Sequence, residues 1–148
     1  MAEAGPMLRL LAEDADDLAI ISAALQDAVA RVGDILWEPK ARRLTIGFNR
    51  FRWEATVGGQ PQRVRSALQI GDVLGVRSRR LRRDRKDAVV ELLAMTFEPG
   101  EAPGGAIIFG FAGGADLRAE VECIDAVLAD LSKAWPARRA PRHDTEPA

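Results

Sequence analysis

Hydrophobic and polar residues alternate along residues 44–54 in the manner of a half-buried β-strand. The apolar positions start on one parity and then change to the other: Leu44, Ile46 and Phe48, followed by Phe51 and Trp53. One inserted residue near Asn49, a β-bulge, would let both halves of the strand face the same core. Arg50 and Arg52 would then point outward. The pattern predicts a bulged strand around which the rest of the chain is organised.

Apolar residues at helical spacing predict a helix on each side of the strands. The first helix is expected over residues 16–31, after a run of carboxylates that suits a helix N-terminus and before Gly33. The second is expected from residue 124 to residue 135, where Pro136 stops it. Its apolar stripe comprises Ile124, Val127, Leu128, Leu131 and Trp135.

Alternating segments bounded by turn residues predict the remaining strands. They cover residues 34–38, 62–70, 73–76, 88–97, 106–112 and 116–122, and residues 7–11 form either a short strand or the lead-in to the first helix. Gly113 and Gly114 predict a hairpin turn, because glycine accepts positive φ. The fold class is therefore α+β: an antiparallel sheet of six to seven strands with an N-terminal helix and a C-terminal capping helix. A pleckstrin-homology-like partly open barrel has this order, apart from the N-terminal helix.

The length of 148 residues is enough for one domain, which we expect over residues 7–135. Residues 136–148 contain three prolines and no large apolar residue, which predicts a disordered tail. The N-terminus has neither a basic region nor a sustained apolar stretch, so we expect a cytoplasmic protein without membrane contact. The single cysteine, Cys123, cannot form an internal disulfide, which agrees with a reducing compartment.

Charge is strongly segregated although the net charge is only −1. Residues 40–86 carry fourteen basic and three acidic side chains, whereas the remainder carries seven basic and nineteen acidic ones. Two interpretations stay open. Acidic and basic surfaces can pair within the molecule, or the basic surface can meet an anionic partner.

Candidate catalytic groups are scarce, and we assign no catalytic residue, metal site or cofactor. His143, the sole histidine, lies in the predicted tail, which removes the usual general base. Cys123 continues the inward parity of its strand and is expected to be buried. Glu120, Glu122 and Asp125 are spaced closely enough to hold a divalent cation, but pairing with nearby arginines explains them more simply. The glycine-rich residues 109–115 lack Walker spacing and are interpreted as a turn.

The most unusual segment has seven cations among ten residues: Arg77, Arg79, Arg80, Arg82, Arg83, Arg85 and Lys86. It is either a solvated loop or an anion-binding element that grips phosphates or carboxylates. The favoured function is a non-enzymatic binding or accessory module with a basic surface for an acidic protein, nucleic acid or anionic metabolite. One alternative is a small enzyme in which Glu120 or Glu122 meets Arg50 or Arg52. Another is weak, nonspecific nucleic-acid binding through residues 77–86.

Several short segments resemble a family of alphaproteobacterial proteins known only as a domain of unknown function. They are residues 25–28 (Leu-Gln-Asp-Ala), 49–51 (Asn-Arg-Phe) with Trp53, 76–78 (Val-Arg-Ser), 111–114 (Phe-Ala-Gly-Gly) and 121–124 (Val-Glu-Cys-Ile). The resemblance covers most of residues 7–135. It implies no activity, ligand or catalytic residue.

Overall fold

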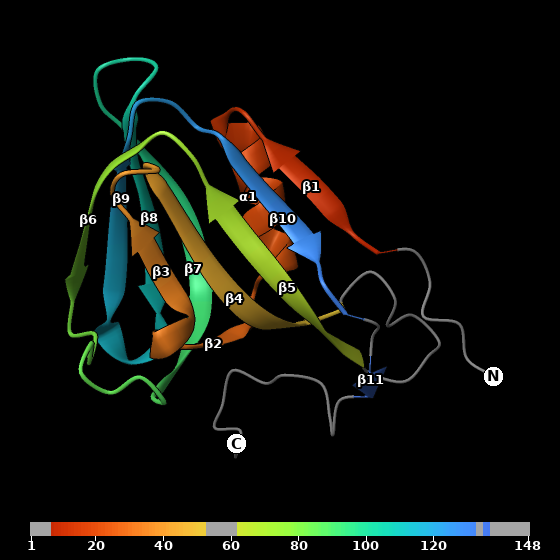
Figure 1. Cartoon of the computed structure of the whole chain (residues 1–148). Coiled ribbons are helices and arrows are strands. Elements are labelled where there is room, and N and C mark those ends of the chain that lie inside the picture. The colour runs from red at the N-terminus through yellow and green to blue at the C-terminus, as the bar shows by residue number, and fades with distance from the viewer. Residues whose placement is uncertain (1–6, 53–61, 133–134, 137–148) are drawn as a thin grey trace.

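A computed structural model describes residues 7–52, 62–132 and 135–136 of the chain. These residues form an α+β fold in which the helix α1 (Ala15–Ala24) lies beside a strongly curved antiparallel sheet (Figure 1). The strands are β1 (Arg9–Ala12), β2 (Val29–Arg31), β3 (Ile35–Glu38), β4 (Arg43–Phe51), β5 (Gln62–Ile70), β6 (Val73–Arg79), β7 (Val89–Pro99), β8 (Gly105–Phe111), β9 (Asp116–Val121), β10 (Ala126–Asp130) and β11 (Trp135–Pro136).

The order of strands across the sheet is β1-β10-β5-β4-β2-β7-β8-β9-β6, with β3 paired to β4 and β11 paired to β5. The sheet curves so that β6 to β9 lie opposite β3, β4 and β5 (Figure 1). The resulting core joins apolar side chains from both halves, including Phe48 of β4, Leu92 of β7 and Phe109 of β8. Strands β3 and β6 each have one unpaired edge, because among the described residues β3 pairs only with β4 and β6 only with β9. The two strands lie on the same side of the molecule (Figure 1).

The helix α1 begins where the carboxylates predicted it, but it ends seven residues earlier than expected, at Ala24. The Asp14 side chain accepts a hydrogen bond from the backbone N–H of Asp17 at 2.8 Å, which caps the N-terminus. After the helix, Asp27 adopts a φ of 64° and its N–H donates to the carbonyl of Leu92. The expected last turns are therefore replaced by β2, which joins the sheet between β4 and β7.

The predicted C-terminal helix is wrong, because residues 126–130 form strand β10. The strand pairs with β1 on one side and β5 on the other, so its backbone groups are satisfied by two neighbours. Ala126, Leu128 and Asp130 face inward, which is the period of a strand. The strand count also exceeds the expected six to seven. The comparison with a pleckstrin-homology-like barrel rested on strands followed by a capping helix, an order that the described residues do not have.

The predicted bulge near Asn49 is also wrong. β4 and β5 stay in one continuous register from Leu44 opposite Ile70 to Phe51 opposite Arg63. Without an inserted residue, the inward parity that begins at Leu44 continues to position 50. Arg50 is therefore buried rather than exposed, and so is the side chain of Arg52.

Several other sequence predictions are confirmed. Strands occupy the segments predicted around residues 34–38, 62–70, 88–97, 106–112 and 116–122. Gly113 and Gly114 have φ values of 88° and 91° in the turn between β8 and β9. Trp53, which the sequence places in the core, and the tail after residue 136 lie outside the described residues.

Candidate functional site

A pocket of about 270 Å³ lies between the unpaired edges of β3 and β6. Two backbone hydrogen bonds connect β6 and the loop after it to the segments on either side of β3. The N–H of Val73 donates to the carbonyl of Arg42 at 2.9 Å, and the N–H of Gly33 donates to the carbonyl of Lys86 at 2.8 Å. Backbone hydrogen bonds therefore connect the segments that flank the two edges. We call the opening between the two edges the β3–β6 pocket.

Six of the ten lining residues of the β3–β6 pocket are apolar. Its apolar lining residues come from β3, β6 and β9 and from the segments next to the two edge strands: Val32, Ile35, Trp37, Val76, Leu81 and Leu117. Leu117 and Val32 are buried, and Trp37 and Val76 are half-buried. An apolar surface of this kind favours the apolar part of a ligand.

The mouth of the pocket is basic. Its remaining lining residues are Ser78 and three cations, Arg77, Arg83 and Lys86. We call these three cations the basic rim. All three are exposed, so their charged groups stand in solvent around the apolar interior. The lining includes no carboxylate.

The charges of the basic rim are poorly neutralised. Arg77 is 3.6 Å from the carboxylate of Glu120, but its side chain is 74% exposed and Glu120 also binds Arg118 at 2.6 Å. Within the described part of the chain, Arg83 and Lys86 have no carboxylate within 4.0 Å. Two of the three rim cations thus have no ion-pair partner there.

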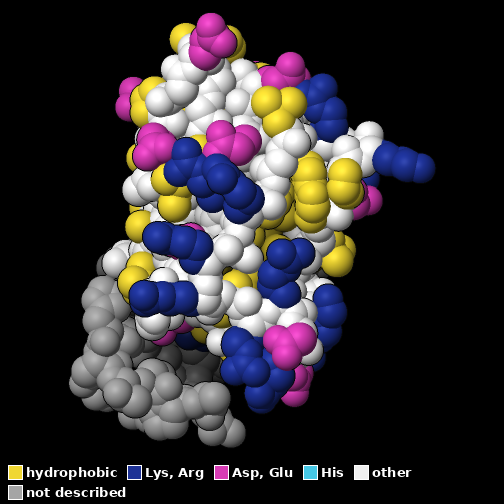
Figure 2. Space-filling view, turned by 90° about the vertical axis from the view of Figure 1, so that its left-hand side faces the viewer, with side chains coloured by type: hydrophobic (Ala, Val, Ile, Leu, Met, Phe, Trp, Pro, Cys, Tyr) yellow, Lys and Arg dark blue, Asp and Glu magenta, His cyan; other side chains and the backbone are white. Residues whose placement is uncertain are grey.

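The four other cations of the basic segment lie away from the pocket lining. Arg79 forms an ion pair with Asp116 at 2.6 Å, and Arg82 lies 3.7 Å from Asp84. Arg80 and Arg85 are exposed on the loop between β6 and β7. In Figure 2, lysine and arginine side chains are spread over this face, with hydrophobic side chains between them. The structure therefore divides the seven predicted anion-binding residues into a rim group and a group outside the pocket.

The Arg79–Asp116 pair changes the titration of the carboxylate. The hydrogen bond from Arg79 holds the pKa of Asp116 below its ordinary value, and the positive charges of Arg80 and Arg118 act in the same direction. The two residues are direct partners in the ladder between β6 and β9. This pair is a cross-strand contact of the kind that stabilises sheet surfaces.

Two of the three acidic residues considered as metal ligands have cationic partners. Glu120 pairs with Arg118, and Glu122 forms a salt bridge with Arg42. The described residues contain no group of three or more side chains able to hold a metal ion together. These contacts agree with the interpretation of the carboxylates as partners of nearby arginines.

The thiol of Cys123 is not activated. Burial raises its pKa, and so does the Asp72 carboxylate, whose oxygen lies 3.4 Å from the sulfur. Because the thiolate is the reactive form, a raised pKa makes the group a poor nucleophile at neutral pH.

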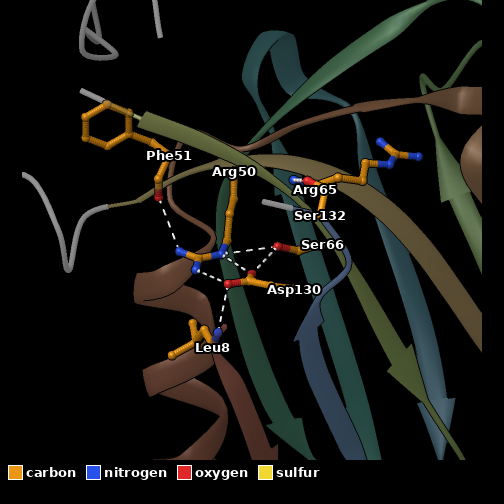
Figure 3. A network of polar contacts seen from close by, with 7 residues as sticks. All are labelled: Leu8, Arg50, Phe51, Arg65, Ser66, Asp130 and Ser132. Atoms are coloured by element: carbon orange, nitrogen blue, oxygen red, sulfur yellow. Dashed lines mark hydrogen bonds and ion pairs between the residues drawn. The ribbon is translucent and has the colours of Figure 1, made fainter. Parts of the chain in front are cut away.

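A second polar constellation, which the sequence did not reveal, lies inside the protein (Figure 3). Arg50 of β4 donates from Nε and Nη2 to the two carboxylate oxygens of Asp130 of β10, both at 3.0 Å. The Ser66 hydroxyl donates to the same carboxylate at 2.7 Å, and the N–H of Leu8 donates to it at 2.8 Å. We call these four residues the buried arginine cluster.

The ion pair of the buried arginine cluster is closed to solvent. The side chains of Arg50 and Asp130 are 0% and 3% exposed. Burial disfavours the charged form of Asp130, but hydrogen bonds from Arg50, Ser66 and Leu8 outweigh it and lower the pKa of the carboxyl group. Asp130 is therefore ionised at neutral pH. With its hydrogen-bonding capacity directed inward, the cluster joins β4, β5, β10 and the N-terminal segment rather than binding a ligand.

The fold and the site define a small α+β protein with a basic-rimmed pocket at the open edges of a curved antiparallel sheet. The chain belongs to the family described as "Protein of unknown function (DUF2948)", whose model matches residues 8–143. The matched range includes the basic segment and all the pocket-lining residues. No curated protein and no solved structure matches the chain. No helix within the described residues is long and apolar enough to cross a membrane.

Proposed function

We propose that this protein is a non-enzymatic binding or accessory module that presents the basic rim to an acidic partner. The observation that supports this proposal is the β3–β6 pocket, whose lining has three cations and no carboxylate. Two of those cations, Arg83 and Lys86, have no carboxylate within 4.0 Å among the described residues. An anionic group on a partner would supply the missing counter-charge.

The electrostatics favour a local contact over long-range attraction. The net charge of −1 gives the molecule little overall pull on a polyanion. The basic rim, in contrast, gathers its charges at one opening, where a carboxylate or phosphate of the partner can meet more than one cation. Ionic strength should weaken such a contact, because exposed charges are screened by salt.

The alternative of a small carboxylate and arginine enzyme has less support. That hypothesis required Glu120 or Glu122 to meet Arg50 or Arg52 in a cleft. Arg50 instead binds Asp130 in the interior, and Arg52 donates to Gln62 at 2.7 Å. The two glutamates have their own arginine partners, so the proposed constellation is not assembled.

The binding proposal is tested by co-purification of the tagged protein from its native host, followed by mass spectrometry. The informative comparison uses two double variants with the same change of charge. Arg83→Glu/Lys86→Glu reverses two cations of the basic rim, and Arg80→Glu/Arg85→Glu reverses two on the same loop outside the pocket. We expect acidic partners to be lost from the rim variant and retained by the loop variant. Identical partners for wild type and rim variant would contradict the proposal.

A second candidate is nonspecific binding of single-stranded nucleic acid. The observation that favours it is Trp37, an aromatic side chain that lines the pocket beside the basic rim. Bases stack on aromatic side chains while cations contact the phosphates. Fluorescence anisotropy with a labelled oligonucleotide tests this candidate. Affinity should fall steeply between about 50 and 200 mM salt, and Trp37→Leu should weaken it.

A further inference from the structure

The β3–β6 pocket combines two properties that a purely electrostatic surface does not need. Its interior is formed by apolar side chains, among them Trp37, Val76 and Leu117, whereas its charges stand at the mouth. A hydrated ion such as phosphate would gain nothing from the apolar interior. A plain hydrocarbon would gain nothing from the rim. The arrangement complements a molecule that has an apolar body and one anionic end.

We propose that the β3–β6 pocket binds an amphipathic anion, with a carboxylate at the basic rim and a short apolar body against Trp37 and Val76. This inference rests on the proposed binding function and names the ligand class for the same site. Arg83 and Lys86 meet the carboxylate, and the apolar body replaces water inside the pocket. Removal of apolar surface from water supplies the affinity, and the cations select for negative charge.

The volume limits the size of the ligand. At about 270 Å³ the pocket lies just below the usual range for small-molecule sites, about 300 to 1,000 Å³. A medium-chain carboxylate fits this limit. A long-chain lipid or a folded protein surface would have to leave most of its apolar surface outside.

Backbone hydrogen bonds lie on both sides of this open pocket. The hydrogen bond from Val73 to Arg42 connects the start of β6 to the turn before β4, and the bond from Gly33 to Lys86 connects the segment before β3 to the loop after β6. A further bond, from the N–H of Val32 to the carbonyl of Ala88 at 2.8 Å, anchors the far end of the basic loop. The binding of a small ligand therefore does not require the sheet to open.

The test uses four probes and backbone amide NMR on the full chain. Octanoate has the apolar body and the charge, acetate has the charge only, octan-1-ol has the body only, and octylammonium has the opposite charge. We expect octanoate to shift the amide signals of residues 35–38 and 76–78 saturably. The other three probes should bind at least about tenfold more weakly, because each lacks one of the two interactions.

Three variants locate the binding site. Arg83→Glu/Lys86→Glu should weaken octanoate binding at least about tenfold, whereas Arg80→Glu/Arg85→Glu should leave it within about twofold, since neither residue lines the pocket. Ser78→Phe places a large side chain in the lining without changing charge and should abolish binding. Melting temperatures of all three variants show whether each one is folded.

The outcomes separate this inference from the proposed function. Equal binding of acetate and octanoate, lost in the rim variant, would overturn the amphipathic ligand and leave an anion-binding module. Equal binding of octan-1-ol and octanoate, unchanged in the rim variant, would show an apolar site and overturn the inference. An absence of octanoate binding would overturn the inference too, and the co-purification experiment would then decide the proposed function independently.

Discussion

Arginine side chains occur in two opposite settings in this protein, the buried arginine cluster and the basic rim. In the cluster, Arg50 makes a two-pronged contact with Asp130 and has no exposed surface. In the rim, Arg77 is 74% exposed and its nearest carboxylate is shared with another arginine. The cluster connects β4, β5 and β10, whereas the rim connects only a loop and an edge strand.

The difference lies in whether the charge is satisfied inside the fold. A buried ion pair is strongly coupled to folding, because removal of one partner leaves the other without compensation in a dry interior. An exposed cation is hydrated in the folded and the unfolded protein and adds little to stability. Its charge is therefore available to a partner. The first kind of arginine should control stability, and the second kind should control binding.

The largest effect on stability is expected from a single substitution in the buried arginine cluster. Arg50→Met leaves the Asp130 carboxylate buried without its cation and should lower the free energy of unfolding by about 3 to 5 kcal/mol. Chemical denaturation measures the change. The double variant Arg50→Met/Asp130→Leu is the control, because it removes both charges and should be less destabilised than Arg50→Met alone. If the free energy of unfolding lost in the double variant equals the sum of the losses in Arg50→Met and Asp130→Leu, the two charges are not coupled.

The acid dependence of stability tests the same cluster. The pKa of Asp130 is lowered in the folded protein, whereas in the unfolded chain an aspartate titrates near about 3.9. The unfolded state therefore takes up the proton more readily. Asp130 contributes stability above about pH 4 and loses it as the pH falls through the folded pKa.

Urea denaturation from neutral to acidic pH compares wild type with Asp130→Asn, which cannot titrate. The stability difference between the two proteins should shrink as the pH falls below about 4. A constant difference across the whole range would show that the charge of Asp130 contributes nothing.

The cluster also explains where prediction from sequence failed. Arg50 stands on the inward parity of Leu44 and Phe48. The bulge was predicted from the apolar residues Phe51 and Trp53 on the other parity, and it also turned Arg50 outward. Charged residues are rarely buried unless they are paired, so the bulge was a reasonable inference. The partner, Asp130, is 80 residues away. It lies in a segment whose apolar residues also fit a helix.

These two errors have one cause. Strict alternation in residues 44–50 places an arginine inward, and the inward positions of β10 are Ala126, Leu128 and Asp130, so an aspartate also lies inward. Either one looks like a defect in a strand when considered alone. Together they indicate a buried ion pair between two strands. The sequence did not reveal this pair, because residues 126–129 are all apolar and do not show which face of the strand is buried.

Strands with apolar inward positions and glycine-marked turns were predictable, because their pattern is local. Strands β7, β8 and β9 are of this kind, and residues 113–114 form the expected turn. The basic segment was also visible as a run of cations. The β3–β6 pocket was not, since Trp37 and Val76 meet only through the curvature of the sheet. Whether the seven cations bind anions stays a prediction.

The comparison predicts that the basic rim can be changed without loss of stability. Arg83→Glu/Lys86→Glu should shift the melting temperature by no more than about 2 °C, because neither side chain has an ion pair within the described chain. Thermal denaturation measures this shift in the protein preparations used for the binding experiments. A large decrease in the melting temperature would show that Arg83 and Lys86 stabilise the fold, as Arg50 does, and would contradict the distinction between the two settings.

The smallest effect is expected at Arg79, which lies between the two settings because it is exposed yet has a carboxylate partner. Its hydrogen bond to Asp116 lowers the pKa of that carboxyl group. Arg79→Ala should therefore raise the pKa of Asp116 toward its ordinary value. Arg80 and Arg118 still act on the carboxylate, so the recovery should be incomplete. Carboxyl carbon NMR over an acid titration measures the pKa directly.

Arg85→Ala is the matched control for this titration, since it removes an arginine from the same loop that has no ion pair with Asp116. It should leave the pKa of Asp116 unchanged. The folded state loses a favourable contact only while Asp116 is ionised, so any loss of stability in Arg79→Ala should be confined to pH values above the pKa of Asp116. An unchanged Asp116 pKa in Arg79→Ala would show that the ion pair does not persist in solution. Arg79 would then belong with the available cations of the rim rather than with the partnered arginines of the fold.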